Sequence, residues 1–424
     1  MLQLKVLDNK PVLAPGELEA YIGQSAPVLA RACAGEAKYA DSLGWLDVEE
    51  WAGEEMLARG EALAAEIRAK ADVFVLIGVG GSNNAARAVA EAIQPAGGTR
   101  IVYAGNTLSP HAVNQMLAQL EGKEVYIDCI AKNFETLEPG VAFRVLRQYL
   151  VKRYGREEAA RRILCTGTCG SSLEELCRRE GYEFLPFATN VGGRYTALTY
   201  VHLVPLAVAG VDIRALAKGA ADMARRLHTE PAEENLALRY AALRSLYFQK
   251  GYRVEILSAF EPQLRWFYKW WEQLFAESEG KDGTGLLPVT GEFSEQLHSL
   301  GQFIQDGTHL LFETFLDVQE QQASCVVQPD EVDDGFAYLD GKDFWQLNKA
   351  SFQATRKAHS QTLPCLTLEM DRLDAYNFGQ LFYFFEFACY LSGSLLGVNP
   401  FDQPGVEAYK GWMFQALGKP GANV

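Results

Sequence analysis

The chain has 424 residues, of which 48% are hydrophobic and 22% are charged, and it contains no long low-complexity tract. It is long enough to bury one large core or two ordinary ones, so we expect a globular protein of two α/β units. The formal net charge of −15 argues against nucleic acid as a partner, because binding to a phosphate backbone depends on clustered Lys and Arg.

After a helical N-terminal region, placed at residues 1–60, short apolar runs alternate with segments of helical periodicity. The apolar runs, each an expected strand, lie at residues 73–77, 101–104, 125–130 and 163–166. Strands separated by helices predict a mostly parallel sheet flanked by helices. We assign this first domain to residues 61–206.

A second alternation of the same kind follows two helices expected at residues 212–228 and 231–250. Its expected strands lie at residues 254–257, 286–289, 323–327 and 365–368. We assign the second domain to residues 207–396 and expect it to end in an aromatic-rich helix at residues 375–396.

A helical C-terminal tail, residues 397–424, is expected to carry one more helix at residues 405–417. The run Gly397-Val-Asn-Pro-Phe-Asp-Gln-Pro separates it from the helix before. In open sheets of this kind, ligands bind at the carboxyl ends of the strands. The loops that follow the strands are therefore the first candidates for a functional site.

The first ten residues lack the basic, apolar and small-residue succession of a signal peptide, and no apolar run approaches a membrane span. We therefore expect a cytoplasmic protein without a membrane partner. The eight cysteines include no CxxC pair and no matching His spacing for zinc, so we expect reduced thiols and no metal. Cys165 and Cys169 raise the question of a redox pair, but two small residues at a strand end are the simpler explanation.

The segment Gly78-Val-Gly-Gly-Ser-Asn-Asn follows an expected strand and opens an Ala-rich helix. Backbone N–H groups around Gly81 and the Ser82 hydroxyl are suited to hold an anion at the start of that helix. Asn83 stands where the dinucleotide fingerprint has its last Gly, which argues against a nicotinamide-dependent oxidoreductase. A tight structural turn explains the segment about equally well.

The segment Ala131-Lys-Asn-Phe-Glu-Thr repeats this design after another expected strand, with Lys132 and Thr136 near a helix start. The two loops are suited to share one phosphate. Without the first loop, a solvated Lys before an N-cap Thr would be the better interpretation.

Other candidate residues lie farther along the chain. Arg194, after two glycines, is always charged and can face a developing oxyanion, although an Arg at a helix start is more often part of an ion pair. Glu277 is one of three carboxylates in a loop expected after a Trp-rich helix at residues 266–274. One of them can be a general base, but for isolated acids in a loop a solvated turn is the better interpretation. Taken singly, the last candidates are more often structural or solvated residues. They are His298, Gln403 and Lys410.

Taken together and in this order, the segments resemble phosphoglucose isomerase, in its compact bacterial form, across nearly the whole chain. The most specific of them are Val191-Gly-Gly-Arg-Tyr-Thr, Glu277-Ser-Glu-Gly-Lys-Asp, Leu297-His-Ser-Leu-Gly-Gln and Asn399-Pro-Phe-Asp-Gln-Pro-Gly-Val-Glu-Ala-Tyr-Lys. The resemblance implies two sugar-isomerase (SIS) domains, a homodimer, no cofactor, and a hexose 6-phosphate substrate. It implies interconversion of glucose 6-phosphate and fructose 6-phosphate in glycolysis and gluconeogenesis.

The resemblance also implies roles for single residues. Glu277 matches the carboxylate that transfers the proton, Arg194 the arginine that stabilises the enediolate, and Lys410 the lysine beside the ring oxygen. His298 matches the histidine donated across the dimer interface. A carboxylate shielded from water suits a base near working pH, and a His–Lys pair can open the ring without metal. The positions that match contacts to phosphate and sugar are Gly81, Ser82, Lys132, Thr136 and Gln403.

The second phosphate loop departs from the family pattern, which begins Ser-Lys-Thr or Ser-Lys-Ser and continues with paired Thr. Here Ala131 replaces the Ser, Asn133 the next hydroxyl and Glu135 a Thr, so hydroxyl donors are lost and an acid appears. We expect Glu135 to be directed to solvent or to a cation such as Lys132, and phosphate affinity to be altered. Where the family usually has Ser, a small or Pro residue, and Gly, this chain has Thr196, Tyr200 and His202.

Two other functions are compatible with the same domains. A sugar-phosphate sensor would account for the altered loop, but a sensor needs neither a base nor a ring-opening acid, so the full catalytic set favours an enzyme. An isomerase of another phosphosugar, such as mannose 6-phosphate, is a nearer alternative that the sequence leaves open.

Overall fold

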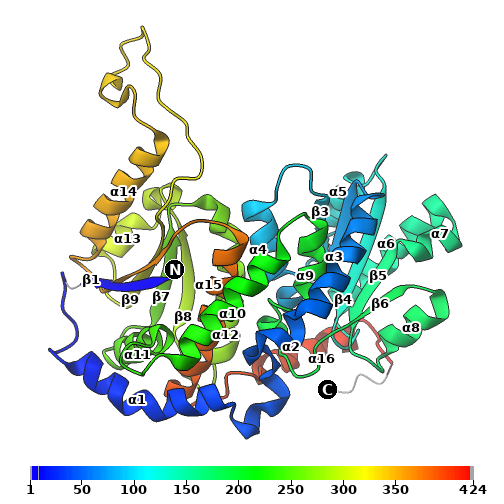
Figure 1. Ribbon diagram of the computed structural model, residues 1–424, viewed down its shortest axis with the longest axis horizontal. Helices are drawn as coiled ribbons and strands as arrows, with labels where there is room; N and C mark the ends of the chain where they lie inside the picture. The colour runs from blue at the N-terminus through cyan, green and yellow to red at the C-terminus, as the bar shows by residue number, and fades with distance from the viewer. Residues whose placement is uncertain (1, 8, 421–424) are drawn as a thin grey trace.

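The structure is a computed structural model, and it describes residues 2–7 and 9–420. The described residues form two five-stranded sheets, each covered by helices, which lie side by side in Figure 1. This confirms the expected α/β class and the two mostly parallel sheets. The helical tail is present as α16 (Glu407–Ala416).

The first sheet has the strand order β3-β2-β4-β5-β6, and all neighbouring strands are parallel. Alternate residues of β2 face opposite sides, since Phe74 and Leu76 belong to one buried cluster and Val75 and Ile77 to another. Both faces are covered, which explains why these strands are continuous apolar runs. The last strand, β6, is not among those expected. The strands are β2 (Val73–Ile77), β3 (Arg100–Ala104), β4 (Val125–Ala131), β5 (Ile163–Gly167) and β6 (Glu183–Pro186).

Helices cover both faces of this sheet. The buried side chains of one face pack against α3 (Glu54–Arg68), α4 (Asn84–Ile93) and α9 (Tyr200–Val208). Those of the other face pack against α5 (Pro110–Ala118), α6 (Leu137–Tyr154), α7 (Arg156–Arg161) and α8 (Ser172–Glu180). The N-terminus of α4 and the N-terminus of α6 both follow the carboxyl end of a strand, at the edge where a ligand is expected.

The second sheet has the order β1-β10-β9-β7-β8. Its first strand, β1, is antiparallel to β10 and pairs Gln3 with Glu369, whereas the other neighbours are parallel. The N-terminal region, expected to be helical, therefore begins with a strand at the edge of the second sheet. The strands are β1 (Gln3–Leu7), β7 (Val254–Ala259), β8 (Leu287–Glu292), β9 (Leu311–Val318) and β10 (Cys365–Met370).

The strand expected at residues 323–327 is wrong. In that segment Val326 forms an isolated bridge with Asp343, and the strand lies earlier in the chain, at β9 between β10 and β7. Residues 319–343 instead form an arm that projects from the second domain at the top of Figure 1. The arm lies outside the sheet, so its apolar side chains face away from the core.

Helix α15 lies at the centre of the second domain and contacts α10, α11 and α12, while α12 contacts α4 of the first domain. Two glycines let α10 and α15 touch, because a Cβ on Gly219 or Gly379 would lie 1.9 Å from a carbonyl oxygen of the other helix. No helix in the described part of the chain is both long and apolar enough to cross a membrane. The remaining helices are α1 (Glu17–Ala34), α2 (Val48–Ala52), α10 (Ile213–Thr229), α11 (Leu236–Gln249), α12 (Arg265–Glu279), α13 (Gly301–Asp306), α14 (Phe344–His359) and α15 (Ala375–Leu396).

Candidate active site

The Gly-rich loop after β2 lies where the two domains meet. Gly80 has a φ of +56°, and a Cβ there would lie 2.8 Å from Nε2 of Gln273 on α12. A Cβ on Gly81 would lie 2.1 Å from the carbonyl oxygen of Gly193. The left-handed backbone favours glycine at position 80, and position 81 requires it because the loop packs directly against the backbone of the turn that carries Arg194.

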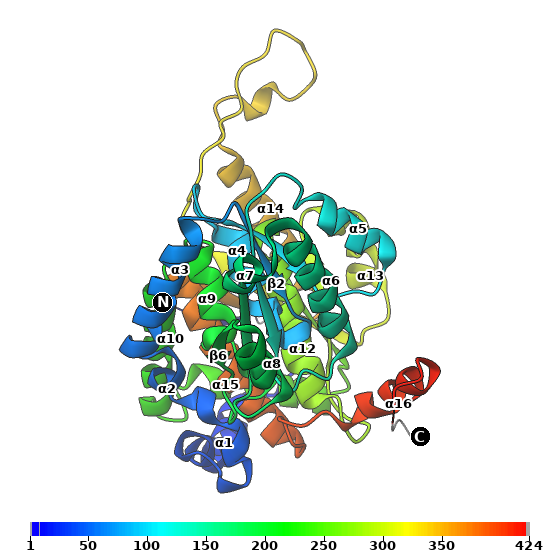
Figure 2. The ribbon, with the colours of Figure 1, turned by 90° about the vertical axis from the view of Figure 1, so that its right-hand side faces the viewer.

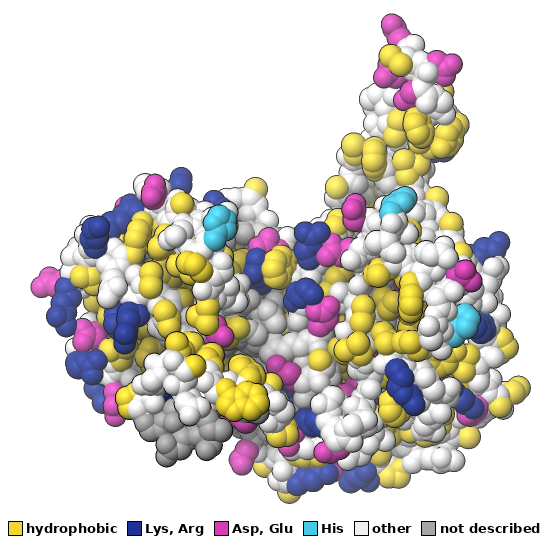
Figure 3. Space-filling view, turned by 180° about the vertical axis from the view of Figure 1, so that it is seen from behind, with side chains coloured by type: hydrophobic (Ala, Val, Ile, Leu, Met, Phe, Trp, Pro, Cys, Tyr) yellow, Lys and Arg dark blue, Asp and Glu magenta, His cyan; other side chains and the backbone are white. Residues whose placement is uncertain are grey.

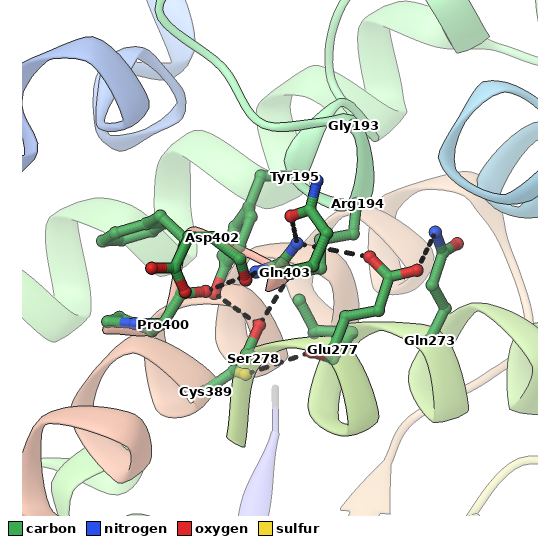
Figure 4. Close-up of polar contacts among 12 residues, drawn as sticks. Gly193, Arg194, Tyr195, Gln273, Glu277, Ser278, Cys389, Pro400, Asp402 and Gln403 are labelled. Atoms are coloured by element: carbon green, nitrogen blue, oxygen red, sulfur yellow. Dashed lines mark hydrogen bonds and ion pairs between the residues drawn. The ribbon is translucent and has the colours of Figure 1, made fainter. Parts of the chain in front are cut away.

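Arg194 is almost fully buried, with 2% of its side chain exposed. A buried cation is costly unless its N–H groups are hydrogen-bonded, and this guanidinium finds its acceptors on α12 and on the loop between α15 and α16 (Figure 4). It therefore joins the first domain to the second and to the tail. The acceptors are Oγ of Ser278 at 2.8 Å, Oε2 of Glu277 at 3.2 Å, Oε1 of Gln403 at 2.8 Å, and the carbonyl oxygens of Pro400 at 2.7 Å and Asp402 at 3.1 Å.

Glu277 lies near the end of α12, and 35% of its side chain is exposed. The loop expected there is wrong, because the helix continues to Glu279. Oε1 of Glu277 accepts a hydrogen bond from Nε2 of Gln273 at 3.1 Å, and Oε2 accepts from Arg194. Oε1 of Gln273 in turn accepts from Nδ2 of Asn84 at 2.9 Å, at the start of α4. The carboxylate is thus held at both oxygens and still reaches solvent.

Two buried ion pairs hold the same end of α12 on the side that faces the core. Nη2 of Arg244 lies 2.7 Å from Oε2 of Glu279, and Nη1 pairs with Glu255, with none of these side chains more than 1% exposed. The hydroxyls of Tyr240 and Thr314 donate to Oε1 of Glu255 at 2.6 and 2.7 Å. Glu279 is therefore held in the core by Arg244, whereas Glu277, two residues before it, reaches solvent and Arg194.

Lys281 fixes the loop that carries Gln403 to the end of α12. Its Nζ donates to the carbonyl oxygens of Ser278 at 2.8 Å and Asn399 at 2.5 Å, and lies 3.4 Å from Oδ1 of Asp402. Burial lowers the pKa of Lys281, since the ammonium group has lost most of its water. Gln403 is thus held beside Arg194 by the arginine itself and by Lys281, which binds the same loop.

A cavity of about 520 Å³ lies between the loop after β2, the loop after β4 and α16. Thr136 is the N-cap residue of α6 but its side chain makes no capping hydrogen bond, so its hydroxyl is available to a ligand. Nζ of Lys410 lies 2.8 Å from Oε1 of Glu407 on the same helix. The expected site residues in the cavity wall are Ser82, Lys132, Thr136 and Lys410.

Lys132 does not pair with Glu135. Its Nζ donates to the carbonyl oxygen of Val191 at 3.0 Å, and burial lowers its pKa. Glu135 is exposed, lines the same cavity, and forms no ion pair within the described residues. Its carboxylate therefore stays solvated beside the expected position of the phosphate.

His298 is not brought into this cluster. It ends a short 3-10 turn and is exposed, and no hydrogen bond or ion pair in the described part of the chain joins it to Arg194, Glu277 or Lys410. The structure thus gathers the other candidates in two adjoining groups. They are Arg194, Glu277 and Gln403 in the hydrogen-bonded cluster, and Gly81, Ser82, Lys132, Thr136 and Lys410 in and behind the cavity wall.

Three residues that shape the site are not evident from the sequence. Gln273 lies four residues before Glu277, a spacing that identifies it only once α12 is known to continue past both. Lys281 lies in the same motif as Glu277. A single cation among three acids indicates an ion pair, but the motif does not indicate that the partner is Asp402 in the tail. His202 is visible only as a departure from the family pattern. Across the described residues, no group of three or more His, Cys, Asp or Glu side chains is placed to hold a metal ion.

Solved structures with the same fold include a hypothetical protein from Thermus thermophilus, which is 27% identical with a TM-score of 0.89 over 98% of this chain and 100% of that one. A glucose-6-phosphate isomerase from Chlamydia trachomatis is 20% identical, with a TM-score of 0.83 over 98% of this chain and 88% of that one. The second likeness is one of fold alone.

Sequence relatives are closer. A glucose-6-phosphate isomerase of Symbiobacterium thermophilum is 44% identical over 390 residues, which cover 89% of this chain and 87% of that protein. One of Clostridioides difficile is 42% identical over 392 residues, with coverage of 89% and 87%. The family model for phosphoglucose isomerase matches residues 54–417. The chain therefore belongs to the phosphoglucose isomerase family.

Proposed function

We propose that this protein is a glucose-6-phosphate isomerase, which interconverts glucose 6-phosphate and fructose 6-phosphate. The observation that carries the proposal is the Glu277–Arg194 pair, 3.2 Å apart, beside a cavity lined by Ser82, Lys132 and Lys410. A half-exposed base, a fixed cation and an anion-binding loop are the groups that proton transfer on a phosphorylated sugar requires. The relatives above 40% identity bear the same name.

In this proposal Glu277 takes the proton from C2 of glucose 6-phosphate and returns it to C1. The reverse reaction moves the proton from C1 of fructose 6-phosphate to C2. Negative charge then moves from the carboxylate to an oxygen of the enediolate. Arg194 contacts Glu277 and can contact that oxygen, so the cation stays neutralised throughout the step. Gln273 holds the second carboxylate oxygen and so fixes the orientation of the base.

Lys410 and His298 are proposed to open the sugar ring, one giving a proton to the ring oxygen as its bond to the anomeric carbon breaks and the other taking the proton of the anomeric hydroxyl as the carbonyl forms. Lys410 lines the cavity of its own chain, but His298 is exposed and outside it. We infer that the site is completed by His298 from a second copy of the chain, in a homodimer.

The arm at residues 319–343 supports a dimer. Its exposed side chains include Val332 at 67%, Phe336 at 56% and Tyr338 at 67%. Figure 3 shows the arm standing clear of the body, with apolar side chains along it and acidic ones at its tip. A projecting segment with this many exposed apolar residues is stabilised when a second copy covers it.

We also propose that the protein is cytoplasmic and that its domains divide near residue 207. The eight cysteines are all free, and five of them are buried, as expected where thiols stay reduced. Apart from β1, the strands of each sheet fall within one of the two proposed segments.

The test is a coupled assay of the purified protein on fructose 6-phosphate in the presence of a chelator. We expect glucose 6-phosphate to form. The Glu277→Gln variant should lose roughly 100- to 10,000-fold in turnover, the range for removal of a general base. Glu272→Gln, on the same helix but paired with Lys269 at 2.8 Å, is the matched control and should stay active. Binding of the sugar phosphate without turnover would indicate a sensor instead.

A second measurement follows the chemistry directly. Exchange of the C2 proton of the substrate with solvent, read by NMR, should stop in Glu277→Gln. If the folded variant exchanged that proton at the parent rate, Glu277 would not be the base.

A further inference from the structure

His202 lies on α9 behind the Gly-rich loop, and it is fully buried, with 1% of its surface exposed. Nδ1 lies 3.1 Å from the backbone nitrogen of Ala86, and Nε2 lies 2.8 Å from the carbonyl oxygen of Gly81. A backbone N–H can only donate, so Nδ1 must be the acceptor. The proton of the neutral ring is therefore on Nε2, which donates to Gly81. Burial lowers the pKa of His202 to about 3, in keeping with this neutral form.

The bond to Ala86 takes the place of a missing helix cap. Asn83 is the N-cap residue of α4, but its side chain donates to the carbonyl oxygen of Gly78 at 3.0 Å and does not cap the helix. The first turn of a helix leaves backbone N–H groups without intrahelical partners. His202 satisfies one of them from a neighbouring helix, so α4 begins in a fixed position relative to α9.

Thr196 extends the same network to the turn that carries Arg194. Its Oγ1 lies 3.0 Å from the carbonyl oxygen of Gly81, 2.8 Å from that of Gly193, and 3.3 Å from Nε2 of His202. The Gly-rich loop, the start of α4 and the arginine turn are thus tied together at one point. At this same point a Cβ on Gly81 would clash with the carbonyl oxygen of Gly193.

We propose that His202 is a positioning residue that holds the Gly-rich loop, and with it the Ser82 hydroxyl, in the shape that grips the substrate phosphate. The inference deepens the proposed function and rests on it. His202 does not reach the cavity itself, so it acts through the Gly81 carbonyl and the first turn of α4.

The test compares three substitutions at one position with a control on the same helix. His202→Gln can keep a donor near the place of Nε2, His202→Asn can keep only an acceptor near the place of Nδ1, and His202→Leu keeps neither. Val204→Ala is the control, because Val204 is fully buried on α9 and packs against Gly60 rather than the loop. Each variant is measured for unfolding temperature, for binding of inorganic phosphate by calorimetry, and for KM and kcat on fructose 6-phosphate.

We expect His202→Leu and His202→Asn to weaken phosphate binding and raise KM roughly tenfold, the effect of losing one hydrogen bond to a binding loop. His202→Gln should stay within about threefold of the parent. In all three, kcat should change less than KM, because Glu277 and Arg194 are held by other partners and phosphate is bound equally in ground and transition states. Val204→Ala should lose stability without a change in phosphate binding.

Parent-like phosphate binding in His202→Leu, or an equal loss in Val204→Ala, would overturn the proposal. If His202→Leu did not fold, equal phosphate binding by the Gln and Asn variants would overturn it. A parent protein that binds phosphate but does not isomerise fructose 6-phosphate would refute the proposed function alone, and the positioning role would be decided by phosphate binding.

Discussion

The consecutive residues Glu277, Ser278 and Glu279 have different partners. Successive residues of a helix are turned by about 100°, so neighbours in the sequence face different surroundings. Glu277 meets Arg194 from the open side, Ser278 accepts from the same guanidinium, and Glu279 reaches the buried Arg244. The sequence can predict that a base lies among these acids. Which of them is exposed depends on packing, and without the family resemblance it is not visible.

Asp128 on β4 gives a prediction about pH. It is fully buried, and the hydroxyl of Thr166 lies 3.2 and 3.3 Å from its carboxyl oxygens. Burial raises the pKa of Asp128 to about 7, against about 3.9 in an unfolded chain. Between these values the folded state binds more protons, so its stability falls as the pH rises through this window and levels off above it.

Asp128→Asn should therefore become more stable relative to the parent as the pH rises from 4.5 to 7, by about 1.4 kcal/mol per pH unit. Urea unfolding at pH 4.5, 6 and 8 measures this. Asp222→Asn is the control, since ion pairing with Lys218 lowers the pKa of Asp222 to about 2, and its difference from the parent should be constant from pH 6 to 8. A pH-independent difference for Asp128→Asn would show that the buried carboxyl does not titrate in this range.

The altered phosphate loop gives a kinetic prediction. Glu135 is exposed in the cavity wall, so solvent screens its repulsion of a phosphate to roughly 1 kcal/mol or less. Glu135→Thr combined with Ala131→Ser should lower KM for fructose 6-phosphate by about two- to fivefold. Turnover should stay the same, because phosphate is held equally in ground and transition states. Steady-state kinetics decide this, and a large rise in kcat would mean that the loop acts on the chemistry.

At the scale of elements, local patterns predict the buried strands and the long helices well. The expected run at residues 73–77 and the helix at residues 375–396 have the bounds found for β2 and α15. Strand β9 is missed because Glu313 and Asp317 interrupt its apolar run. Their partners come from distant segments: Ser258 donates to Glu313 at 2.6 Å, and Lys349 pairs with Asp317. The end of α12 is missed for the same reason, since the partner of Glu279 lies on α11.

The Arg244–Glu279 ion pair, which holds the end of α12, can be tested by Glu279→Gln. Breaking a buried ion pair leaves Arg244 partly uncompensated, so we expect a loss of roughly 3–5 kcal/mol in the free energy of unfolding. Turnover should also fall, because the turn that holds Glu277 loses its support. Urea unfolding and kcat are the measurements, and Glu272→Gln is the control, because Glu272 is partly exposed on the same helix and pairs with Lys269 rather than with Arg244. Parent-like stability would mean that the Arg244–Glu279 ion pair does not hold this end of α12 in place.

At the scale of the whole molecule, the sequence predicts two α/β units and a tail because each alternation of strand and helix is local. It does not predict that β1 pairs with β10, since this contact joins residues 3–7 to residues 365–369. It also does not predict that the loop before α16 is bound by Arg194 and Lys281 from the two domains. Figure 2 shows α16 standing off from the body beyond that loop. The domain boundary near residue 207 stays a prediction.

The proposed dimer predicts complementation between inactive subunits. A Glu277→Gln subunit still carries His298, and a His298→Ala subunit still carries Glu277. If His298 acts in the neighbour's site, a hybrid dimer has one intact site. Random exchange should then restore about one quarter of the parent activity, because half of the dimers are hybrids and half of their sites are complete.

The control for this experiment comes from Lys410, which lines the cavity of its own chain. Mixing Glu277→Gln with Lys410→Ala subunits should restore no activity, because the two residues belong to one site and every site of the hybrid lacks one of them. Mass spectrometry of the mixed sample verifies that hybrids form. Recovery with Lys410→Ala but not with His298→Ala would assign the shared residue to the tail and leave His298 outside the site. Recovery with His298→Ala alone would mean that the exposed histidine of one chain completes the active site of the other.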